Sequence, residues 1–122
     1  MMVFDPAERI VLFHEAVNGM DYAAMERFFA PEATWISDGV GSLVGREAVL
    51  AAIRHYFETY PDQVGVNSLV ETLTPLSGRA VWSVRATHAV TGKPLVREGE
   101  ETITFNEDGQ VVSVDVTDYQ AF

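Results

Sequence analysis

Residues 79–105 read RAVWSVRATHAVTGKPLVREGEETITF, and this stretch decides the fold. Apolar and polar side chains alternate along residues 79–90 and again along residues 95–105, which is the pattern of strands with one buried face. The Thr91-Gly92-Lys93-Pro94 segment between them has the composition of a turn. The stretch therefore predicts a hairpin of two long antiparallel strands.

The alternation also predicts which side chains of this hairpin point into the protein. A four-residue turn at 91–94 places His88 opposite Arg97 and, further along, Glu101 opposite Val84. The other face is much more polar, so this assignment puts the apolar residues inside. The inward set is Trp82, Val84, Ala86 and His88 on the first strand, and Leu95, Arg97, Gly99, Glu101, Ile103 and Phe105 on the second.

Helices are predicted before the hairpin and further strands on both sides of it. Apolar residues recur at helical spacing after Asp5-Pro6, after Asp21 and after Gly45, which predicts three helices over 6–18, 22–29 and 45–60. Strands are predicted over 33–36, 63–73 and 110–118. Three N-terminal helices packed on a curved, mainly antiparallel sheet make an α+β fold over one domain, residues 1–122. Such a curled sheet leaves a concave interior that suits a small ligand.

Composition excludes several classes of function. The chain has 122 residues with 18 acidic and 8 basic side chains, a net charge of −10, and no cysteine. An acidic chain without a basic stripe is not expected to bind nucleic acid or an anionic membrane surface. No apolar run is long enough to span a membrane and no signal peptide is recognisable, so we expect a cytoplasmic protein. The three histidines fall on separate elements and no phosphate loop is present, so neither a metal nor a cofactor is expected.

The inward face carries four ionisable residues, which are seldom incidental in an apolar interior. Arg97, Asp118 and His88 could form an ion-pair cluster at the end of the sheet, or could contact a ligand. Glu101 lies deeper, and is either functional or a carboxyl that reaches water or a backbone donor. His14 and His55 are expected to be exposed or interfacial. The expected pocket wall is Phe13, Trp35, Phe57, Trp82, Val84, Arg97, Ile103, Val114 and Val116.

Several short segments resemble the nuclear transport factor 2-like superfamily, in its SnoaL-like and ketosteroid-isomerase-like branch. They are Ala16-Val17-Asn18-Gly19-Met20-Asp21, Phe28-Phe29-Ala30-Pro31-Glu32-Ala33-Thr34-Trp35, Asp38-Gly39-Val40-Gly41, Gly45-Arg46-Glu47-Ala48 and Gly109-Gln110-Val111-Val112. The resemblance implies a cone-shaped half-barrel, usually dimeric. It implies no single activity, because this fold carries isomerases, cyclases, dehydratases, epoxide hydrolases and proteins without chemistry.

The resemblance also implies roles for individual residues. Asp38 matches the general base of the steroid isomerases. Glu101 lies four residues before a Phe-Asn pair and so matches their protonated aspartate. That aspartate is a known example of a carboxylic acid kept neutral by apolar surroundings. Phe13 stands where those enzymes have their oxyanion tyrosine and has no hydroxyl, which argues against steroid isomerisation.

Two further positions bear on the other activities of the branch. Asp118, followed by Tyr119, resembles the acidic strand end of the family's cyclases and epoxide hydrolases. Those hydrolases also have an Arg-x-Asp pair on the preceding strand, whereas Arg97 is followed by Gly99 at the second position. This departure counts against epoxide hydrolysis.

Asp38, Glu101, His88 and Asp118 are therefore the candidate catalytic residues. Carboxyl and imidazole groups around an apolar cavity suit proton transfer next to a carbonyl group. The hypothesis is a cofactor-free isomerase, cyclase or lyase acting on a small apolar carbonyl compound. The alternative is a non-catalytic ligand-binding or scaffold protein of the same fold. In both cases the polar outward face of the sheet is expected to form a homodimer interface.

Overall fold

The computed structural model describes residues 3–37 and 41–119. The helices are α1 (Pro6–Asn18), α2 (Tyr22–Phe28) and α3 (Arg46–Thr59). The strands are β1 (Phe29–Ser37), β2 (Gly41–Val44), β3 (Val64–Thr74), β4 (Ser77–Thr87), β5 (Pro94–Phe105) and β6 (Val111–Asp118).

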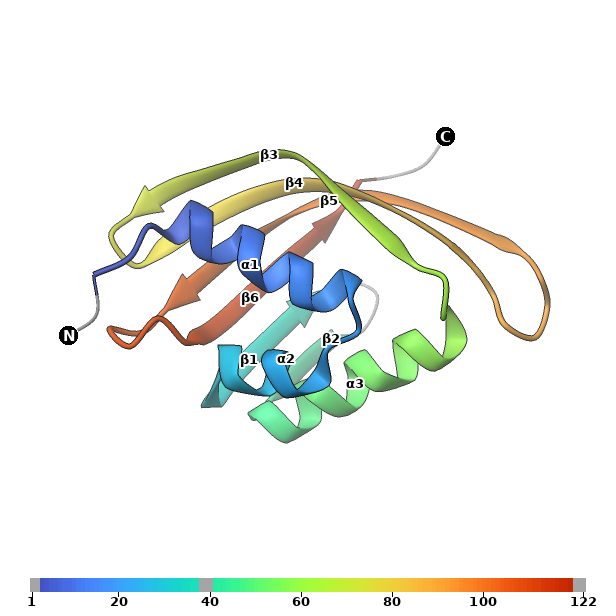
Figure 1. Ribbon diagram of the computed structural model, residues 1–122, viewed down its shortest axis with the longest axis horizontal. Coiled ribbons are helices and arrows are strands. Elements are labelled where there is room, and N and C mark those ends of the chain that lie inside the picture. The colour runs from blue at the N-terminus through green and yellow to red at the C-terminus, as the bar shows by residue number, and fades with distance from the viewer. Residues whose placement is uncertain (1–2, 38–40, 120–122) are drawn as a thin grey trace.

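The strands form one open sheet in the order β2-β1-β6-β5-β4-β3, antiparallel throughout except for the parallel pair β1 and β6. Figure 1 shows β3, β4 and β5 arching over α1, with α2 and α3 on the same inner side near β1 and β2. This confirms the α+β fold predicted from the sequence, with three helices on a curved, mainly antiparallel sheet.

Local sequence signals place the helices. The Asp5 carboxylate accepts a hydrogen bond from the Ala7 N–H and Pro6 occupies the first helical position, so α1 begins where its free N–H groups are capped. Asp21 caps α2 in the same way through the Ala24 N–H. No helix within residues 3–37 and 41–119 is long and apolar enough to cross a membrane.

The inner face of the sheet and the apolar sides of the helices enclose the core. Its fully buried members include Ile10 and Phe13 from α1, Val49 from α3, and Ile103 and Val114 from the sheet. Burial of such side chains supplies the main stabilising free energy, about 1.5–3 kcal/mol for each large apolar group. Phe13 meets the rings of Phe28 and Phe29 edge-on, which fixes the approach of α1 to α2.

The register of the β4–β5 hairpin differs from the prediction. Arg97 lies opposite Val84, not opposite His88, and Glu101 lies opposite Ala80 instead of Val84. The cause is a longer turn, because β4 ends at Thr87 and β5 starts at Pro94. His88 closes this turn. Its Nδ1 accepts hydrogen bonds from the N–H groups of Val90 and Thr91, and its own N–H donates to the Lys93 carbonyl.

The change in register keeps the predicted inward face of β5. The pairing shifts by four residues, and side chains alternate with a period of two, so the same residues still point inward. Glu101, Ile103 and Phe105 are accordingly buried. On β6, an irregularity beside Phe105 places Val111 in the core together with Val114 and Val116.

The first strand is longer than the sequence predicts, and a second strand follows it. β1 runs from Phe29 to Ser37, through Pro31, and β2 was not anticipated. Strand β1 pairs in parallel with β6, and its described ladder has a gap between Phe29 and Thr34, where the proline falls. The β2 segment then pairs back onto the second half of β1.

Gly99 on β5 provides a test of this packing. An added Cβ would lie 2.6 Å from the Thr117 carbonyl oxygen and 3.0 Å from the Trp82 ring. Gly99→Ala is therefore expected to lower the free energy of unfolding by about 1–3 kcal/mol, as overpacked cores do. Urea denaturation measures this change. Thr102→Ala, at an exposed position of the same strand, should cost less than about 1 kcal/mol, and an equal loss in both variants would contradict the argument.

Candidate functional site

A cavity of about 190 Å³ lies between the inner face of the sheet and helices α1 and α3. Most of its wall is apolar, from Phe13, Val17, Trp35, Leu43, Val49, Ala52, Ile53, Phe57, Trp82, Val84 and Val116. An apolar cavity of about 150 Å³ in a protein can hold benzene. This cavity therefore has room for a compound of one or two rings.

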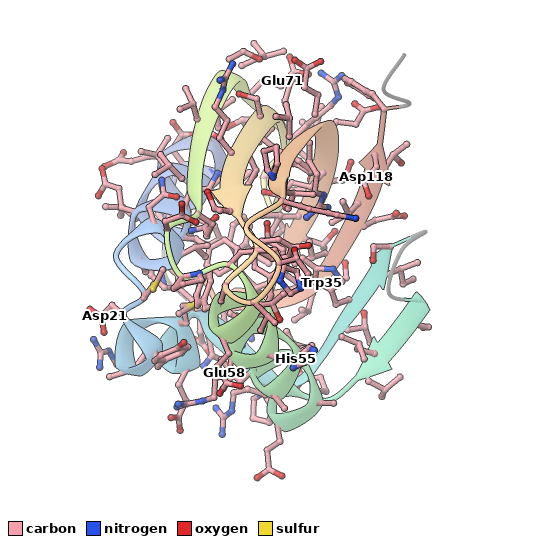
Figure 2. The ribbon with its side chains drawn as sticks, turned by 90° about the vertical axis from the view of Figure 1, so that its right-hand side faces the viewer. Asp21, Trp35, His55, Glu58, Glu71 and Asp118 are labelled. Atoms are coloured by element: carbon pink, nitrogen blue, oxygen red, sulfur yellow. The ribbon has the colours of Figure 1, made fainter. Side chains whose placement is uncertain are left out.

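The predicted pocket wall is largely where the sequence places it. Phe13, Trp35, Phe57, Trp82, Val84, Arg97 and Val116 all line the cavity, and so does Glu101. Trp35 extends from β1 toward the interior beside α3 (Figure 2). Ile103 and Val114 also point inward but are fully buried among core side chains and do not line the cavity. They lie where the helices pack directly on the sheet.

The four candidate catalytic residues are not brought together in one cluster. Glu101 lines the cavity, whereas His88 lies in the β4–β5 turn with its ring 5.5 Å from that of Tyr60. Asp118 stands at the end of β6 (Figure 2) and binds Arg97 without lining the cavity. Asp38 lies outside the described residues; Ser37, which precedes it in the chain, lines the cavity and is 7% exposed.

Glu101 forms its principal contact with His14, a residue that the sequence analysis expected to be exposed or interfacial. The Glu101 side chain is nearly buried in the apolar face of β5, and its Oε1 contacts Nε2 of His14 from α1. The other ring nitrogen of His14, Nδ1, lies 2.8 Å from Oδ1 of Asn67 on β3. Three elements far apart in the chain thus meet at one carboxyl–imidazole pair.

The sequence does carry a signal that the His14 side chain points toward the interior. The residue lies four positions after Ile10 and three before Val17, so it belongs to the same helical stripe as these two apolar residues. Its partner Asn67 lies opposite Trp82 of β4, and the contact between His14 and Asn67 depends on how α1 packs against β3.

The hydrogen bonds of His14 constrain where its protons lie. Both ring nitrogens face oxygen atoms, so Nδ1 donates to Asn67 and one proton lies between Nε2 and the Glu101 carboxyl group. Burial acts to lower the pKa of His14, but the Glu101 carboxylate and the hydrogen bonds to Glu101 and Asn67 outweigh it. The pKa of His14 is raised above 6.5, which favours its charged imidazolium form.

Arg97 supplies a positive charge at the cavity wall. Its guanidinium donates to Oδ1 of Asp118 at 2.8 Å and lies over the Trp82 ring, 5.2 Å from its centroid. Burial acts to lower the pKa of Arg97, and the bond to Asp118 raises it overall. The predicted cluster is thus an Arg97–Asp118 pair from which His88 is separate.

Two further polar groups of the wall were not predicted, Tyr56 on α3 and Gln63 in the segment that follows it. Gln63 is 4% exposed, and its Nε2 has no hydrogen-bond partner among the described residues. The buried Tyr56 hydroxyl likewise makes no hydrogen bond of normal geometry there. Burial raises the pKa of Tyr56 although the nearby Arg97 opposes the shift, so the hydroxyl keeps its proton. The sequence carried no signal for Gln63, whose burial depends on how the chain turns from α3 into β3.

The described residues do not offer a metal site. No three His, Asp or Glu side chains within residues 3–37 and 41–119 lie close enough together to hold an ion. The carboxyl–imidazole pair suits proton transfer to or from a ligand, and Arg97, Tyr56 and Gln63 add hydrogen-bond donors to the wall.

Comparison with known proteins agrees with this geometry. A model of the SnoaL-like domain matches residues 10–114 of the chain. No curated protein matches it in sequence. Solved structures with a similar backbone include a nuclear transport factor 2-like protein and a protein with a ketosteroid-isomerase-like fold. The resemblance stated from the sequence motifs is thereby confirmed.

Three solved structures show how closely the backbone is shared. Bal32a, from a soil-derived mobile gene cassette, has a TM-score of 0.85 at 22% identity, covering 94% of this chain and 89% of its own. SalBIII, an epoxide hydrolase/cyclase-like enzyme of pyran ring formation in salinomycin, has a TM-score of 0.82 at 15% identity, with coverage of 93% and 89%. IdmH from Streptomyces antibioticus, a proposed polyketide cyclase, has a TM-score of 0.81 at 19% identity, covering 94% of this chain and 92% of its own. At these identities the likeness establishes the fold alone.

The raised pKa of His14 predicts a pH-dependent stability. A group whose pKa is higher in the folded than in the unfolded state stabilises the protein fully below the unfolded value, here 6.5. This contribution is lost as the pH rises through the folded-state pKa. His14→Gln should therefore lower the free energy of unfolding by about 1–3 kcal/mol at pH ~6, as loss of a charged hydrogen bond does, and by less at pH ~9.

Urea denaturation at the two pH values measures the difference. His55→Gln is the matched control, because His55 is exposed on α3 (Figure 2). It should change stability little and equally at both values. A cost of His14→Gln that does not depend on pH would contradict the imidazolium assignment.

Proposed function

The chain belongs to the SnoaL-like domain family, and we propose that it is a cofactor-free isomerase, cyclase or lyase that transfers protons on a small, mostly apolar carbonyl compound. The observation that carries this proposal is the His14–Glu101 pair in the wall of an otherwise apolar cavity. Solved structures of similar fold include polyketide cyclase-like and epoxide hydrolase/cyclase-like proteins, which is compatible with carbonyl chemistry.

The arrangement favours Glu101 as the base. Its Oε1 is held by His14, while Oε2 makes no hydrogen bond within the described part of the chain. In the proposed step, Oε2 removes a proton from the carbon next to the substrate carbonyl group. The C–H electron pair forms the carbon–carbon double bond of the enolate, and the negative charge moves to the carbonyl oxygen. Returning the proton elsewhere gives isomerisation, and expelling a leaving group gives elimination.

His14 and Asn67 serve this step as positioning residues. The imidazolium neutralises the carboxylate in a poorly hydrated site, and Asn67 fixes the ring so that Nε2 faces Glu101. The family resemblance assigns the base to Asp38 and a protonated state to Glu101. The contact between His14 and Glu101 favours Glu101 as the base instead, so these two assignments make different predictions.

Exchange of carbon-bound protons for deuterium tests the proposal without knowledge of the natural substrate. β-Tetralone carries acidic protons next to its carbonyl group and has the two-ring size that the cavity can hold. We expect the protein to accelerate their exchange in deuterated water, followed by proton NMR. Glu101→Gln should lower the accelerated rate by about 10²–10⁴-fold, the usual contribution of a general base.

The matched control for this experiment is Glu98→Gln, at an exposed outward position of the same strand, which should keep the wild-type rate. Asp38→Asn separates the two assignments. A large loss in Asp38→Asn with little change in Glu101→Gln would transfer the role of base to Asp38. No acceleration by the wild-type protein, despite binding of β-tetralone, would favour the non-catalytic ligand-binding alternative.

We further propose that the chain forms a homodimer through the outward face of its sheet. This face carries exposed apolar side chains at Val64, Val66 and Leu69 of β3 and Val96 of β5. Exposed apolar groups that share one face of a sheet are typical of interaction surfaces. Light scattering at micromolar concentration should give twice the 13.5 kDa mass of the chain.

Val66→Arg should convert this dimer to a monomer, because it places a charge in the middle of the apolar group. Val90→Arg is the control, since Val90 is 89% exposed in the β4–β5 turn. A wild-type mass of a single chain, or equal effects of both variants, would contradict the proposed interface.

A further inference from the structure

Gln63 has a buried donor that the protein itself does not use. The residue is 4% exposed, lines the cavity, and its Nε2 has no hydrogen-bond partner among the described residues. A buried donor without a partner destabilises a protein by about 1–3 kcal/mol, so such groups are rare and call for an explanation.

The cavity wall that contains Gln63 also carries the donors of Tyr56 and Arg97. The Tyr56 hydroxyl keeps its proton and makes no hydrogen bond of normal geometry with the described residues. Arg97 donates to Asp118, which balances its charge, and its guanidinium faces the Trp82 and Tyr56 rings. A site with unused donors and little net charge suits a neutral acceptor oxygen better than a carboxylate, whose charge would remain unbalanced.

The proposed proton transfer needs such a donor. When the C–H bond breaks, negative charge gathers on the carbonyl oxygen, and hydrogen-bond donors aimed at this atom lower the barrier. Phe13 occupies the wall without a hydroxyl group, and both donor positions of the His14 ring are taken by Glu101 and Asn67. Gln63 and Tyr56 are the described residues of the cavity wall whose polar side-chain atoms are fully buried without a hydrogen-bond partner of normal geometry.

We infer that Gln63 Nε2, assisted by the Tyr56 hydroxyl, binds the carbonyl oxygen of the ligand. The inference rests on the proposed function and specifies its substrate class: a neutral carbonyl compound that turns its oxygen toward the loop after α3. Its reacting carbon then faces Glu101. Gln63 is thus a binding residue that also stabilises the developing enolate.

Gln63→Leu tests this role through binding. Leucine fills similar space without polar atoms, and the two ligands compared are β-tetralone and tetralin, a hydrocarbon of nearly the same shape. Both tryptophans of the chain, Trp35 and Trp82, line the cavity, so quenching of their fluorescence reports occupancy. We expect Gln63→Leu to weaken β-tetralone binding by about tenfold and to leave tetralin binding unchanged or tighter. Tyr56→Phe should act in the same direction.

Thermal unfolding without ligand provides a second readout. Because Gln63→Leu removes an unpaired buried donor, it should raise Tm by roughly 3–6 °C. Gln110→Leu is the matched control: its side-chain amide accepts a hydrogen bond from Asn106 in the β5–β6 turn, away from the cavity. This variant should lower Tm slightly and leave both affinities unchanged.

Three results would overturn the inference. They are an equal loss of affinity for both ligands in Gln63→Leu, a lower Tm for this variant, and a wild-type protein without preference for the carbonyl compound. The outcome is separable from that of the proposed function. If Gln63→Leu loses carbonyl preference but Glu101→Gln keeps the exchange rate, the donor site stands and the assignment of the base falls.

Discussion

The interior of this protein depends on keeping one carboxylate in an apolar wall. Glu101 is 5% exposed and alternates along β5 with side chains that face the core. An isolated carboxylate in such surroundings would take up a proton or disrupt the packing. His14 prevents this by placing a charged imidazole against Oε1, and Asn67 holds that imidazole from its other side. The pair is stable only when α1, β3 and β5 are all in place.

This requirement fixes the position of α1. The helix must bury Ile10 and Phe13 and at the same time direct His14 toward Glu101, which leaves little freedom to rotate. Gly78 on β4 permits the close approach, because a Cβ at this position would lie 2.6 Å from Cδ1 of Ile10. The Asp5 carboxylate further ties the start of the helix to Thr72 of β3. The site and the helix packing therefore constrain each other.

The fold was largely predictable because its signals are local. Caps at Asp5 and Asp21 and the alternation along β4 and β5 depend on neighbouring residues only. The hairpin register was not predictable in this way, since it depends on the His88 side chain binding two backbone N–H groups of the turn. An error of four residues left the inward face intact, which explains why most of the cavity wall was predicted in spite of it.

The polar part of the site was less predictable, because its partners come from separate elements. Glu101 was found from strand alternation and from the family resemblance. His14 was expected to be exposed or interfacial, because a histidine next to apolar positions of a helix has no visible partner until the sheet packs over it. Tyr56 and Gln63 were not predicted as site residues, because the burial of their polar atoms without a partner depends on how the segments around them pack in three dimensions.

The similar folds of SalBIII and IdmH show that this backbone tolerates extensive change in sequence. Proton transfer from a carbon next to a carbonyl group needs two polar groups in an apolar cavity: a base and a donor for the oxygen. Phe13 has no hydroxyl group, so the tyrosine donor that the steroid isomerases have at this position is missing here. A chain that carries out proton transfer without this tyrosine needs another buried donor for the oxygen. A buried polar atom without a hydrogen-bond partner is a candidate for that role. Gln63 meets this condition, because its buried Nε2 has no hydrogen-bond partner among the described residues and a carbonyl ligand would supply one.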